Sequence, residues 1–490
     1  MKRCLSLTML VAVTLLGCAR TGQNVIEDAA EAMGGAAAIS AATTFVMEGT
    51  GTTYRLAQHH APGADLPIYE LHTYRKEVDL ENQRWRVEQV RTGHFGTSRP
   101  VNQQPLVQAI DRDVAFDVPA DGNPRRLNAQ IGRDRHTDLY HHPLVALKAA
   151  LQGKPEATVG PVMEEEGYEV VDVTLADGLH LTLSVDAATG LLSRIESTTH
   201  HPFFGDVVIA TSFSDWEQSG EFLLPSRISQ TLDKYRNGDF SLSSQVNAEI
   251  QDLSAPAEVA SAQDPVPQPV EVTSEELAPG VWVLGAGYNS VLIEFPSYTA
   301  IVEAARNDQT ALAVIEKARE MVPDKPVQYV INTHFHSDHS GGIRAAVAEG
   351  LTVITHEIHR AFFEELVMRP RTLIPDHLAN NPKPLQIETV SGDGPYELTD
   401  GDRTIVIHRL KDDLHAAGML MVYLPKERIL VEADVFTPRP GAASPFATNF
   451  LAQVRDLGLR VNRIVPVHGR VVPFSALQQV VRRIAAAPSG

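Results

Sequence analysis

The sequence predicts two folded parts of different class: a layered α/β domain in the C-terminal half, preceded by a β-rich antiparallel α+β domain. Two observations predict this division. In the first half, apolar and polar residues alternate on both sides of short turns, as in "YEVVDVTLADGLHLTLSV" around Asp177-Gly178, which is typical of an antiparallel meander with one buried face. Beyond residue 272, short apolar runs alternate with helical patterns, as expected where sheets and helices share a core.

Composition and charge restrict the possible partners. The chain has 490 residues, of which 21% are charged, and its formal net charge is -19. Nucleic-acid binding needs clustered Lys and Arg, so this balance argues against a nucleic-acid partner and leaves a small molecule as the expected substrate. The sequence makes no prediction of the oligomeric state.

The N-terminus has the anatomy of an export signal: "MKR", then the apolar run "LSLTMLVAVTLL", then "LLGC" ending at Cys18. This end resembles a bacterial lipobox, which implies cleavage after residues 1–17 and lipid attachment at Cys18. Such a chain would be anchored in the cell envelope facing the periplasm, and Ala19 favours the outer over the inner membrane. The alternative is an ordinary secretory signal with an incidental cysteine. The only other cysteine is Cys4, so the exported chain has no thiolate for catalysis.

The β-rich domain is expected at 18–252, beginning with a helical region at 23–42 that is broken at Gly34-Gly35. Its strand rhythm, in "VDAATGLLSRIE" and "GDVVIATSFSDW", resembles the half-barrel of lipoprotein-carrier proteins, which implies a curved sheet around an apolar groove. Three histidine pairs lie far apart in the sequence, and we interpret them as surface or packing residues: His59-His60, His141-His142 and His200-His201. Residues 253–272 are rich in Ala and Pro and predict a linker.

The second domain is expected at 273–490. "VWVLGAGYNSVLIEF" and "TAIVEA" predict strands, and "DQTALAVIEKAREM" predicts a helix capped by Asn307 or Asp308. "VQYVIN" and "LTVITH" predict buried strands, each followed by a helix. A hairpin is expected to turn at Asp400-Gly401, and after it predicted strands and helices alternate again.

The motif "THFHSDHSGG" at 333–342 lies between a predicted strand and the next helix, where open α/β sheets tend to place their sites. Imidazole and carboxylate are ligands that zinc prefers. His334 and His336 can face one ion while Asp338 and His339 face another. The alternative is a solvated histidine-rich loop, which the density of ligand-type side chains disfavours.

This motif resembles that of the metallo-β-lactamase superfamily, which implies an αββα sandwich and three further ligands in a fixed order. Candidates of each type follow in that order: His415, Asp434 and His468. The resemblance implies that His334, His336 and His415 bind the first metal. It implies that Asp338, His339 and His468 bind the second, with Asp434 bridging. Two positions depart from the family pattern, Ala433 for a usual Gly, and Ala416-Ala417 for a usual Thr-Asp or Thr-Gly.

The resemblance implies two zinc ions, a shared water whose pKa is depressed toward neutrality, and hydrolysis of an ester, thioester, lactone or amide. Asp338 would orient the nucleophile as well as bind metal. The absence of a cysteine ligand and the presence of Asp434 argue against β-lactamase activity. Two alternatives stay open: an iron-dependent sulfur dioxygenase-like member, and a lipoprotein that binds lipid or another hydrophobic ligand and carries an accessory metal domain.

Substrate selection is expected from residues 356–384, which are too long for a simple connector. They contain Arg369 and Arg371, either of which could contact an anionic substrate. The competing interpretation ties these arginines to Glu364 or Glu365 at the surface.

Overall fold

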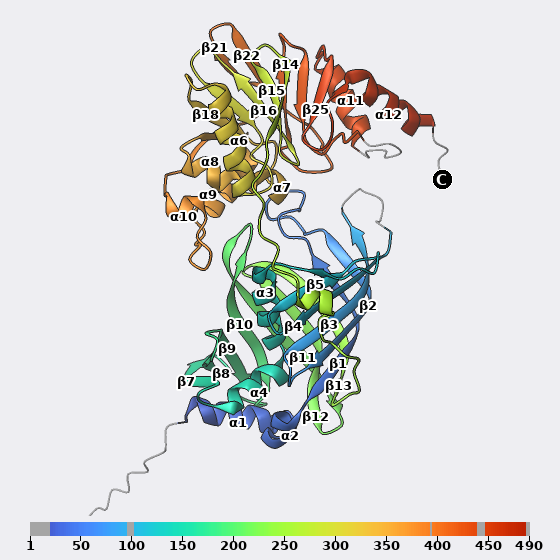
Figure 1. The fold of residues 1–490 in the computed structure, drawn as a ribbon, viewed down its shortest axis with the longest axis vertical. Coiled ribbons are helices and arrows are strands. Elements are labelled where there is room, and N and C mark those ends of the chain that lie inside the picture. The colour runs from blue at the N-terminus through green and yellow to red at the C-terminus, as the bar shows by residue number, and fades with distance from the viewer. Residues whose placement is uncertain (1–19, 96–101, 393, 439–445, 487–490) are drawn as a thin grey trace, which may run out of the picture.

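The computed structural model describes residues 20–95, 102–392, 394–438 and 446–486. Cys4 and Cys18, the predicted lipidation site, lie outside the described residues. The described chain forms two domains stacked along the long axis of the molecule (Figure 1). One domain contains a single thirteen-stranded sheet, and the other contains a seven-stranded and a six-stranded sheet.

The N-terminal domain is a large antiparallel sheet, as the alternating pattern predicts. At its centre, β1 (Thr44–Tyr54) pairs with β13 (Tyr235–Val246), so the two ends of the domain's chain meet there. Beyond β1 the sheet continues through β2 (Ile68–Asp79), β3 (Arg84–His94), β4 (Gln104–Asp111), β5 (Val114–Val118) and β6 (Arg125–Arg126). Beyond β13 it continues through β12 (Phe222–Leu232), β11 (Gly205–Ser219), β10 (Leu192–His201), β9 (His180–Asp186), β8 (Tyr168–Leu175) and β7 (Ala157–Glu165). The predicted hairpin at 177–178 joins β8 and β9.

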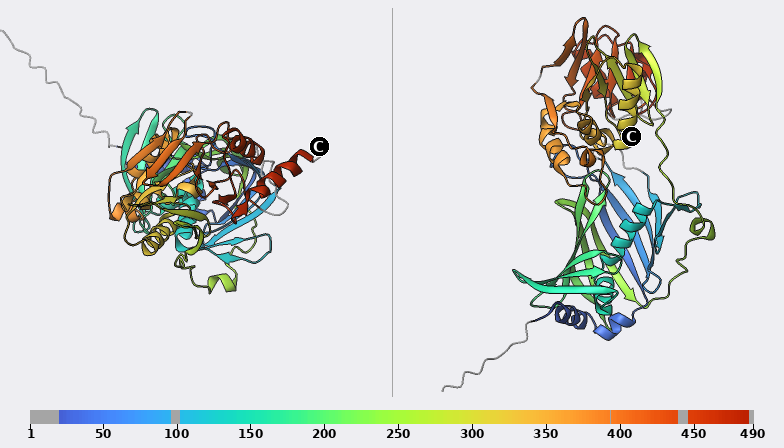
Figure 2. Two further views of the ribbon diagram at one scale, coloured as in Figure 1. Left: turned by 90° about the horizontal axis from the view of Figure 1, so that it is seen from above. Right: turned by 60° about the vertical axis from the view of Figure 1, so that its left-hand side comes forward.

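Helices fill the hollow of this sheet. The N-terminal helices are α1 (Gly22–Ala32) and α2 (Ala36–Ala41), separated at the predicted glycine pair, and α3 (Ala129–Tyr140) and α4 (Pro143–Gln152) follow β6. Helix α3 contacts both β5 and β10, strands of opposite halves of the sheet, so the sheet must bend around it (Figure 2). The apolar core lies between these helices and the strands. The likeness to lipoprotein carriers stays a prediction.

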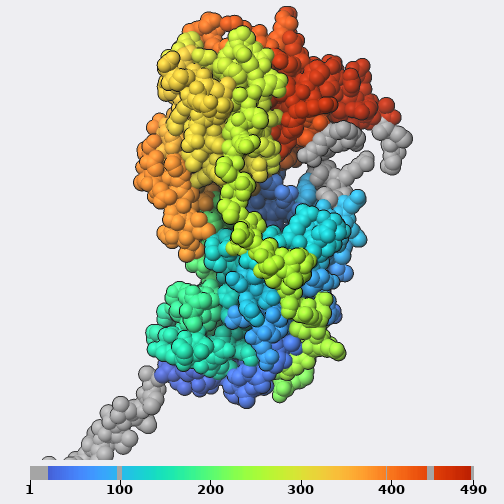
Figure 3. All heavy atoms as spheres, viewed as in Figure 1, coloured from blue at the N-terminus to red at the C-terminus, as the bar shows by residue number. Residues whose placement is uncertain are grey.

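The segment between β13 and the second domain is largely extended. Residues 265–269 are exposed and carry no regular structure, in keeping with their prolines. Figure 3 shows this segment, in yellow-green, running along the outside of the molecule. One short helix interrupts it, α5 (Ala257–Ala260), whose Val259 packs against Ala109 and Phe116 of the large sheet.

The C-terminal domain is a sandwich of two sheets. The first sheet contains β14 (Thr273–Ala278), β15 (Val281–Gly285), β16 (Asn289–Glu294), β17 (Thr299–Val302), β18 (Val327–Ile331), β19 (Thr352–His356) and β20 (Gln386–Val390). The second contains β21 (Tyr396–Asp400), β22 (Arg403–Arg409), β23 (Leu420–Leu424), β24 (Ile429–Glu432), β25 (Arg463–Pro466) and β26 (Val472–Pro473). Apolar side chains from both sheets, among them Ile331 and Val422, form one buried cluster between them.

Helices cover the outer faces of both sheets, which gives the predicted αββα layering. The first sheet is covered by α6 (Asp308–Met321), α7 (Ser337–Ser340), α8 (Ile343–Ala348), the 3-10 turn η1 (Glu357–His359), α9 (Arg360–Met368) and α10 (His377–Asn380). The second is covered by α11 (Ala447–Asp456) and α12 (Phe474–Ala486). Within the described residues, none of the helices has the length and apolar character needed to cross a membrane.

The cap of α6 matches the sequence prediction and can be tested. The Asn307 side chain accepts a hydrogen bond of 2.9 Å from the backbone N–H of Thr310. Replacing such a cap by alanine costs about 1 kcal/mol, which corresponds to a fall of about 2–4 °C in the melting temperature of a domain of this size. We expect this fall in the C-terminal transition of Asn307→Ala by calorimetry. Glu316→Ala, an exposed change on the same helix, should leave the transition in place.

Candidate metal centre

All seven side chains predicted as metal ligands lie together at one edge of the sandwich. The loop after β18 carries His334 and His336, and the short helix α7 that follows it carries Asp338 and His339. The other three come from the loop between β22 and β23, the end of β24 and the end of β25, and they are His415, Asp434 and His468. His334 and His468, 134 positions apart, are brought to one place because each follows a strand of a parallel pair, β18 beside β19 and β25 beside β24.

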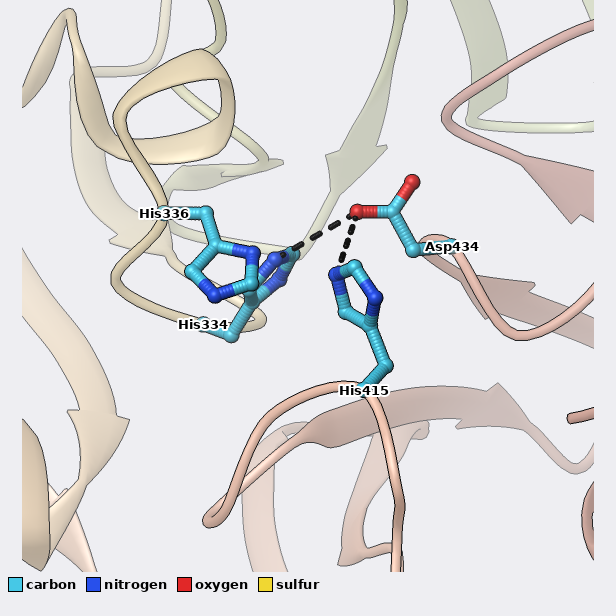
Figure 4. A group of neighbouring side chains, drawn as sticks. All are labelled: His334, His336, His415 and Asp434. Atoms are coloured by element: carbon cyan, nitrogen blue, oxygen red, sulfur yellow. Dashed lines mark ion pairs between the residues drawn. The ribbon is translucent and has the colours of Figure 1, made fainter. Parts of the chain in front are cut away.

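The first group consists of three imidazoles that converge on one carboxylate (Figure 4). One ligand atom from each of His334, His336, His415 and Asp434 lies within 4.8 Å of the others. The Asp434 Oδ2 atom is 2.9 Å from His415 Nε2 and 3.4 Å from His334 Nε2. Three imidazoles and a carboxylate oxygen in this arrangement match the donor set of a zinc or iron site.

The second group shares Asp434 with the first. It contains Asp338, His339, Asp434 and His468, again with ligand atoms within 4.8 Å of one another. The Asp434 Oδ2 atom is 2.9 Å from His339 Nε2, and Oδ1 is 2.9 Å from His468 Nε2. The Asp338 Oδ2 atom is 3.5 Å from His339 Nε2 and 3.6 Å from His468 Nε2. Asp434 is therefore placed between the two groups, where the resemblance expected a bridging ligand.

The protonation of His334 and His336 suits cation binding. His334 Nε2, His336 Nδ1 and His415 Nε2 are buried and make no well-aligned hydrogen bond, although the first and the third lie close to Asp434 Oδ2. Burial, assisted by the neighbouring histidines, holds the pKa of His334 well below 6.5 and lowers the pKa of His336 to about 3. Neutral imidazoles keep a lone pair for a metal ion. The residues present therefore fit a metal pair.

Glu303, at the end of β17, is a functional residue that sequence reasoning missed. Its buried carboxylate lies 2.8 Å from His339 Nδ1 through Oε2, and its Oε1 accepts a hydrogen bond of 2.6 Å from the backbone N–H of Thr333. A carboxylate only accepts, so His339 Nδ1 carries a proton toward Glu303, which fixes the ring with Nε2 directed into the second group, 2.9 Å from Asp434 Oδ2. The signal in the sequence was a lone glutamate closing the apolar run "TAIVEA".

Two aromatic rings border the two groups. The Tyr288 ring lies edge-on to His468 at 4.3 Å between centroids, and the Phe446 ring lies edge-on to His415 at 5.5 Å. Burial and then the charge of Asp338 raise the pKa of Tyr288, so its phenol stays protonated at neutral pH. These rings contribute apolar surface beside the ligands.

Arg369 contacts residues of the N-terminal domain. Its Nε donates a hydrogen bond of 2.6 Å to the backbone oxygen of Phe204, and its guanidinium pairs with Asp233; both partners belong to the N-terminal domain. The alternative contact with Glu365 is also present, at 3.5 Å. Arg369 is therefore committed to the junction between the domains.

Arg371 is likewise directed to the junction and not to the metal ligands. Its guanidinium donates a hydrogen bond of 2.6 Å to the backbone oxygen of Phe203 and pairs with Asp376 at 2.9 Å. Only 9% of its side chain is exposed, and it is already paired. The structure shows the Arg369–Glu365 contact of the competing interpretation and adds partners in the first domain for both arginines, while a substrate contact stays a prediction.

The histidine pairs divide between two roles. His141 and His142 are buried inside the N-terminal domain, in keeping with packing residues. By contrast, His59 and His60 lie in the loop between β1 and β2, which reaches the metal ligands: the His59 backbone oxygen accepts a hydrogen bond of 2.9 Å from His336 Nε2. No local sequence pattern indicates this contact, because its partners are 277 positions apart.

Comparison with known proteins found one family that resembles the second domain. Residues 285–474 match the family model described as the metallo-beta-lactamase superfamily. This range contains all seven candidate ligands. A comparison with curated proteins found no match to the chain.

Solved structures of metallo-β-lactamases resemble part of the chain. One, from Pontibacter korlensis, is 16% identical with a TM-score of 0.35, covering 44% of this chain and 100% of its own. FIM-1 from Pseudomonas aeruginosa, in its mono-zinc form, is 18% identical with a TM-score of 0.35, covering 45% of this chain and 99% of its own. The protein from Hirschia baltica is 19% identical with a TM-score of 0.33, covering 43% of this chain and 96% of its own.

The role of Glu303 leads to a prediction about metal affinity. Residues that orient a ligand from behind typically contribute about 10- to 100-fold in affinity. We expect Glu303→Gln to weaken binding of the second metal ion by about this factor, because the neutral amide no longer holds the His339 tautomer in place. Competition with a chromophoric chelator measures the affinity. Glu294→Gln, a change in the same sheet whose partner is Lys325, is the control, and equal affinities in both variants would contradict the assignment.

Proposed function

We propose that the chain, whose C-terminal domain belongs to the metallo-β-lactamase superfamily, is a zinc-dependent hydrolase of ester, thioester, lactone or amide bonds. Membership of the superfamily and the two His/Asp groups support metal-dependent hydrolysis in general. The identity of the metal and the class of bond are our proposal, and the donor set of imidazoles and carboxylates is one that suits zinc.

The sharing of Asp434 is the observation that carries this proposal. Its two carboxylate oxygens lie 2.9 Å from imidazoles of both groups, His415 in the first and His468 in the second. The nitrogens of the first group that lack a hydrogen bond face one another and Asp434, as ligand atoms around a cation would.

A pair of zinc ions held by these residues would supply Lewis acidity and a water of lowered pKa. The chain's own residues perform the remaining tasks. Asp338 has the most exposed side chain of the second group, at 34% against 14% for His468, so it is placed to accept a hydrogen bond from an attacking water. The sequence has no cysteine beyond Cys18, so the proposed reaction uses water and not a protein thiolate.

We further propose that the protein is a lipoprotein of the bacterial cell envelope that faces the periplasm. This proposal is supported by the basic start, the apolar run and the "LLGC" end of the first 18 residues. Acylation at more than one position of the terminal cysteine would give a stable anchor, whereas a single acyl chain gives marginal binding.

Metal content and hydrolysis together test the catalytic proposal. We expect about two zinc ions per chain, and loss of most bound metal and of ester or lactone hydrolysis in Asp434→Ala, because Asp434 belongs to both groups. His336→Ala should lose mainly the first ion. The control is His377→Ala, whose ring pairs with Glu349 away from the ligands. Elemental analysis and a panel of ester, thioester, lactone, amide and β-lactam substrates give the readouts.

The same experiment separates the alternatives. If the chain contains one iron ion and oxidises a sulfur substrate with oxygen, the protein is an iron-dependent sulfur dioxygenase-like member and the hydrolase proposal is overturned. A folded chain that takes up no metal would overturn both and leave a ligand-binding lipoprotein.

The anchor has its own test. We expect the wild-type chain to fractionate with membranes and Cys18→Ser to be released from them, because the acyl chains are lost with the thiol. Metabolic labelling with a fatty-acid analogue reports the modification directly. A Cys18→Ser chain that stays with the membranes without label would show that another feature holds the protein there.

A further inference from the structure

The loop between β1 and β2, residues 55–67, extends from the N-terminal domain to the metal ligands. The backbone oxygen of Ala57 accepts a hydrogen bond of 3.1 Å from the N–H of Ser337, which lies between two predicted ligands. The backbone oxygen of His60 accepts one of 2.7 Å from the N–H of Ala417, two residues after the ligand His415. The loop thus contacts two of the three segments that carry the ligands of the first group.

The same loop sets the tautomer of one ligand. His336 Nε2 lies 2.9 Å from the backbone oxygen of His59. A carbonyl oxygen can only accept, so the proton of this imidazole is on Nε2 and the lone pair is on Nδ1. His336 Nδ1 is buried without a partner and belongs to the first group. The ring is therefore oriented for a cation by an atom of the other domain.

The loop also holds one oxygen of Asp338. The Gln58 amide donates a hydrogen bond of 2.9 Å to Asp338 Oδ1. The other oxygen, Oδ2, is the one that lies 3.5 Å from His339 Nε2 and 3.6 Å from His468 Nε2. Gln58 thus anchors the carboxylate on one side and leaves its second oxygen facing the second group.

The loop is itself firmly placed. Ala57 has a φ of 51°, a left-handed conformation that a residue with a side chain adopts only when its surroundings impose it. It is buried within the same apolar cluster as Phe335, the residue between two ligands. The His59 ring is 1% exposed and lies edge-on to Phe335 at 4.9 Å. These contacts give Gln58 and the His59 carbonyl a fixed position.

We propose that the N-terminal domain is a working part of the metal centre: its loop 55–67 positions His336 through the His59 carbonyl and Asp338 through the Gln58 amide. Gln58 is a positioning residue, because it acts through Asp338. This inference rests on the proposed metal-dependent function and adds to it a role for the first domain. It predicts that the second metal ion depends on a side chain 280 residues away from its ligand.

Cobalt binding to the full chain tests this inference, with Co²⁺ alone as the probe. Gln58→Met keeps the length of the side chain and removes the donor, and Gln58→Ala removes both. The matched control is Asp233→Asn, which breaks the pair with Arg369 at the same junction but touches no ligand. Titration followed by the visible absorption of the bound ion reports both stoichiometry and ligand geometry.

We expect both Gln58 variants to bind the second Co²⁺ ion about 10- to 100-fold more weakly than the parent, with an altered spectrum for that ion. The first ion should bind as in the parent, and so should both ions in Asp233→Asn. Melting temperatures that match the parent would show that the loss is not one of folding.

The outcomes separate this inference from the proposed function. If the parent and Gln58→Met bind two ions with equal affinity and the same spectra, the inference fails while the metal centre stands. If Asp233→Asn loses the second ion to the same degree, general loosening of the junction explains the effect and the positioning role is overturned. If the parent binds no cobalt, the proposed metal function fails, and the inference fails with it.

Discussion

The structure of the second domain depends on concentrating seven imidazole and carboxylate groups in one largely buried volume around Asp434. Such groups are costly to remove from water unless each is paired. Close approaches such as the 2.9 Å between His339 Nε2 and His468 Nε2 place lone pairs against each other unless a cation or a proton lies between them. Asp434 is the ligand that both groups share, because one of its oxygens lies 2.9 Å from His415 Nε2 and the other 2.9 Å from His468 Nε2. The position of Asp434 at the end of β24 therefore constrains every loop around it.

This concentration of ligands requires a second layer of groups that fix each ring. His339 is held by Glu303, His336 by the His59 carbonyl, and His334 Nδ1 lies 3.1 Å from the Thr333 hydroxyl. Left-handed backbone conformations gather in the same region, at Ala57, Glu303 and Asp434, with φ of 51°, 74° and 61°. Each costs about 1–3 kcal/mol and persists only where surrounding contacts impose it. Strain and buried polarity thus occur together, as is typical of functional sites.

The sequence was informative where function is encoded locally and uninformative where it depends on distant contacts. Strand rhythm predicted the antiparallel first domain, and the strand–loop–helix pattern around "THFHSDHSGG", with three further candidates, named all the residues that the structure brings together. Gln58 escaped detection because no local pattern distinguishes it from any polar loop residue. The roles of Arg369 and Arg371 stayed open for the same reason: a guanidinium near a site can contact substrate or protein, and only the fold places Asp233 and Phe203 beside them. The signal for Glu303 was present, but a single charged strand end is too common to interpret alone.

The contacts at the junction also indicate a role for the long segment after α9. This segment holds the two domains together, because Arg369, Arg371 and Thr372 all form hydrogen bonds or ion pairs with residues 202–206 or Asp233 of the first domain. The loop 55–67 makes a second, separate set of contacts at the ligands themselves. Two attachments at different places fix the orientation of one domain against the other, whereas one would leave a hinge. A rigid junction is what a positioning role requires, because a hydrogen bond from a mobile domain could not hold a ligand to within the few tenths of an ångström that metal coordination demands. The large sheet and the metal domain therefore form one structural unit around the site.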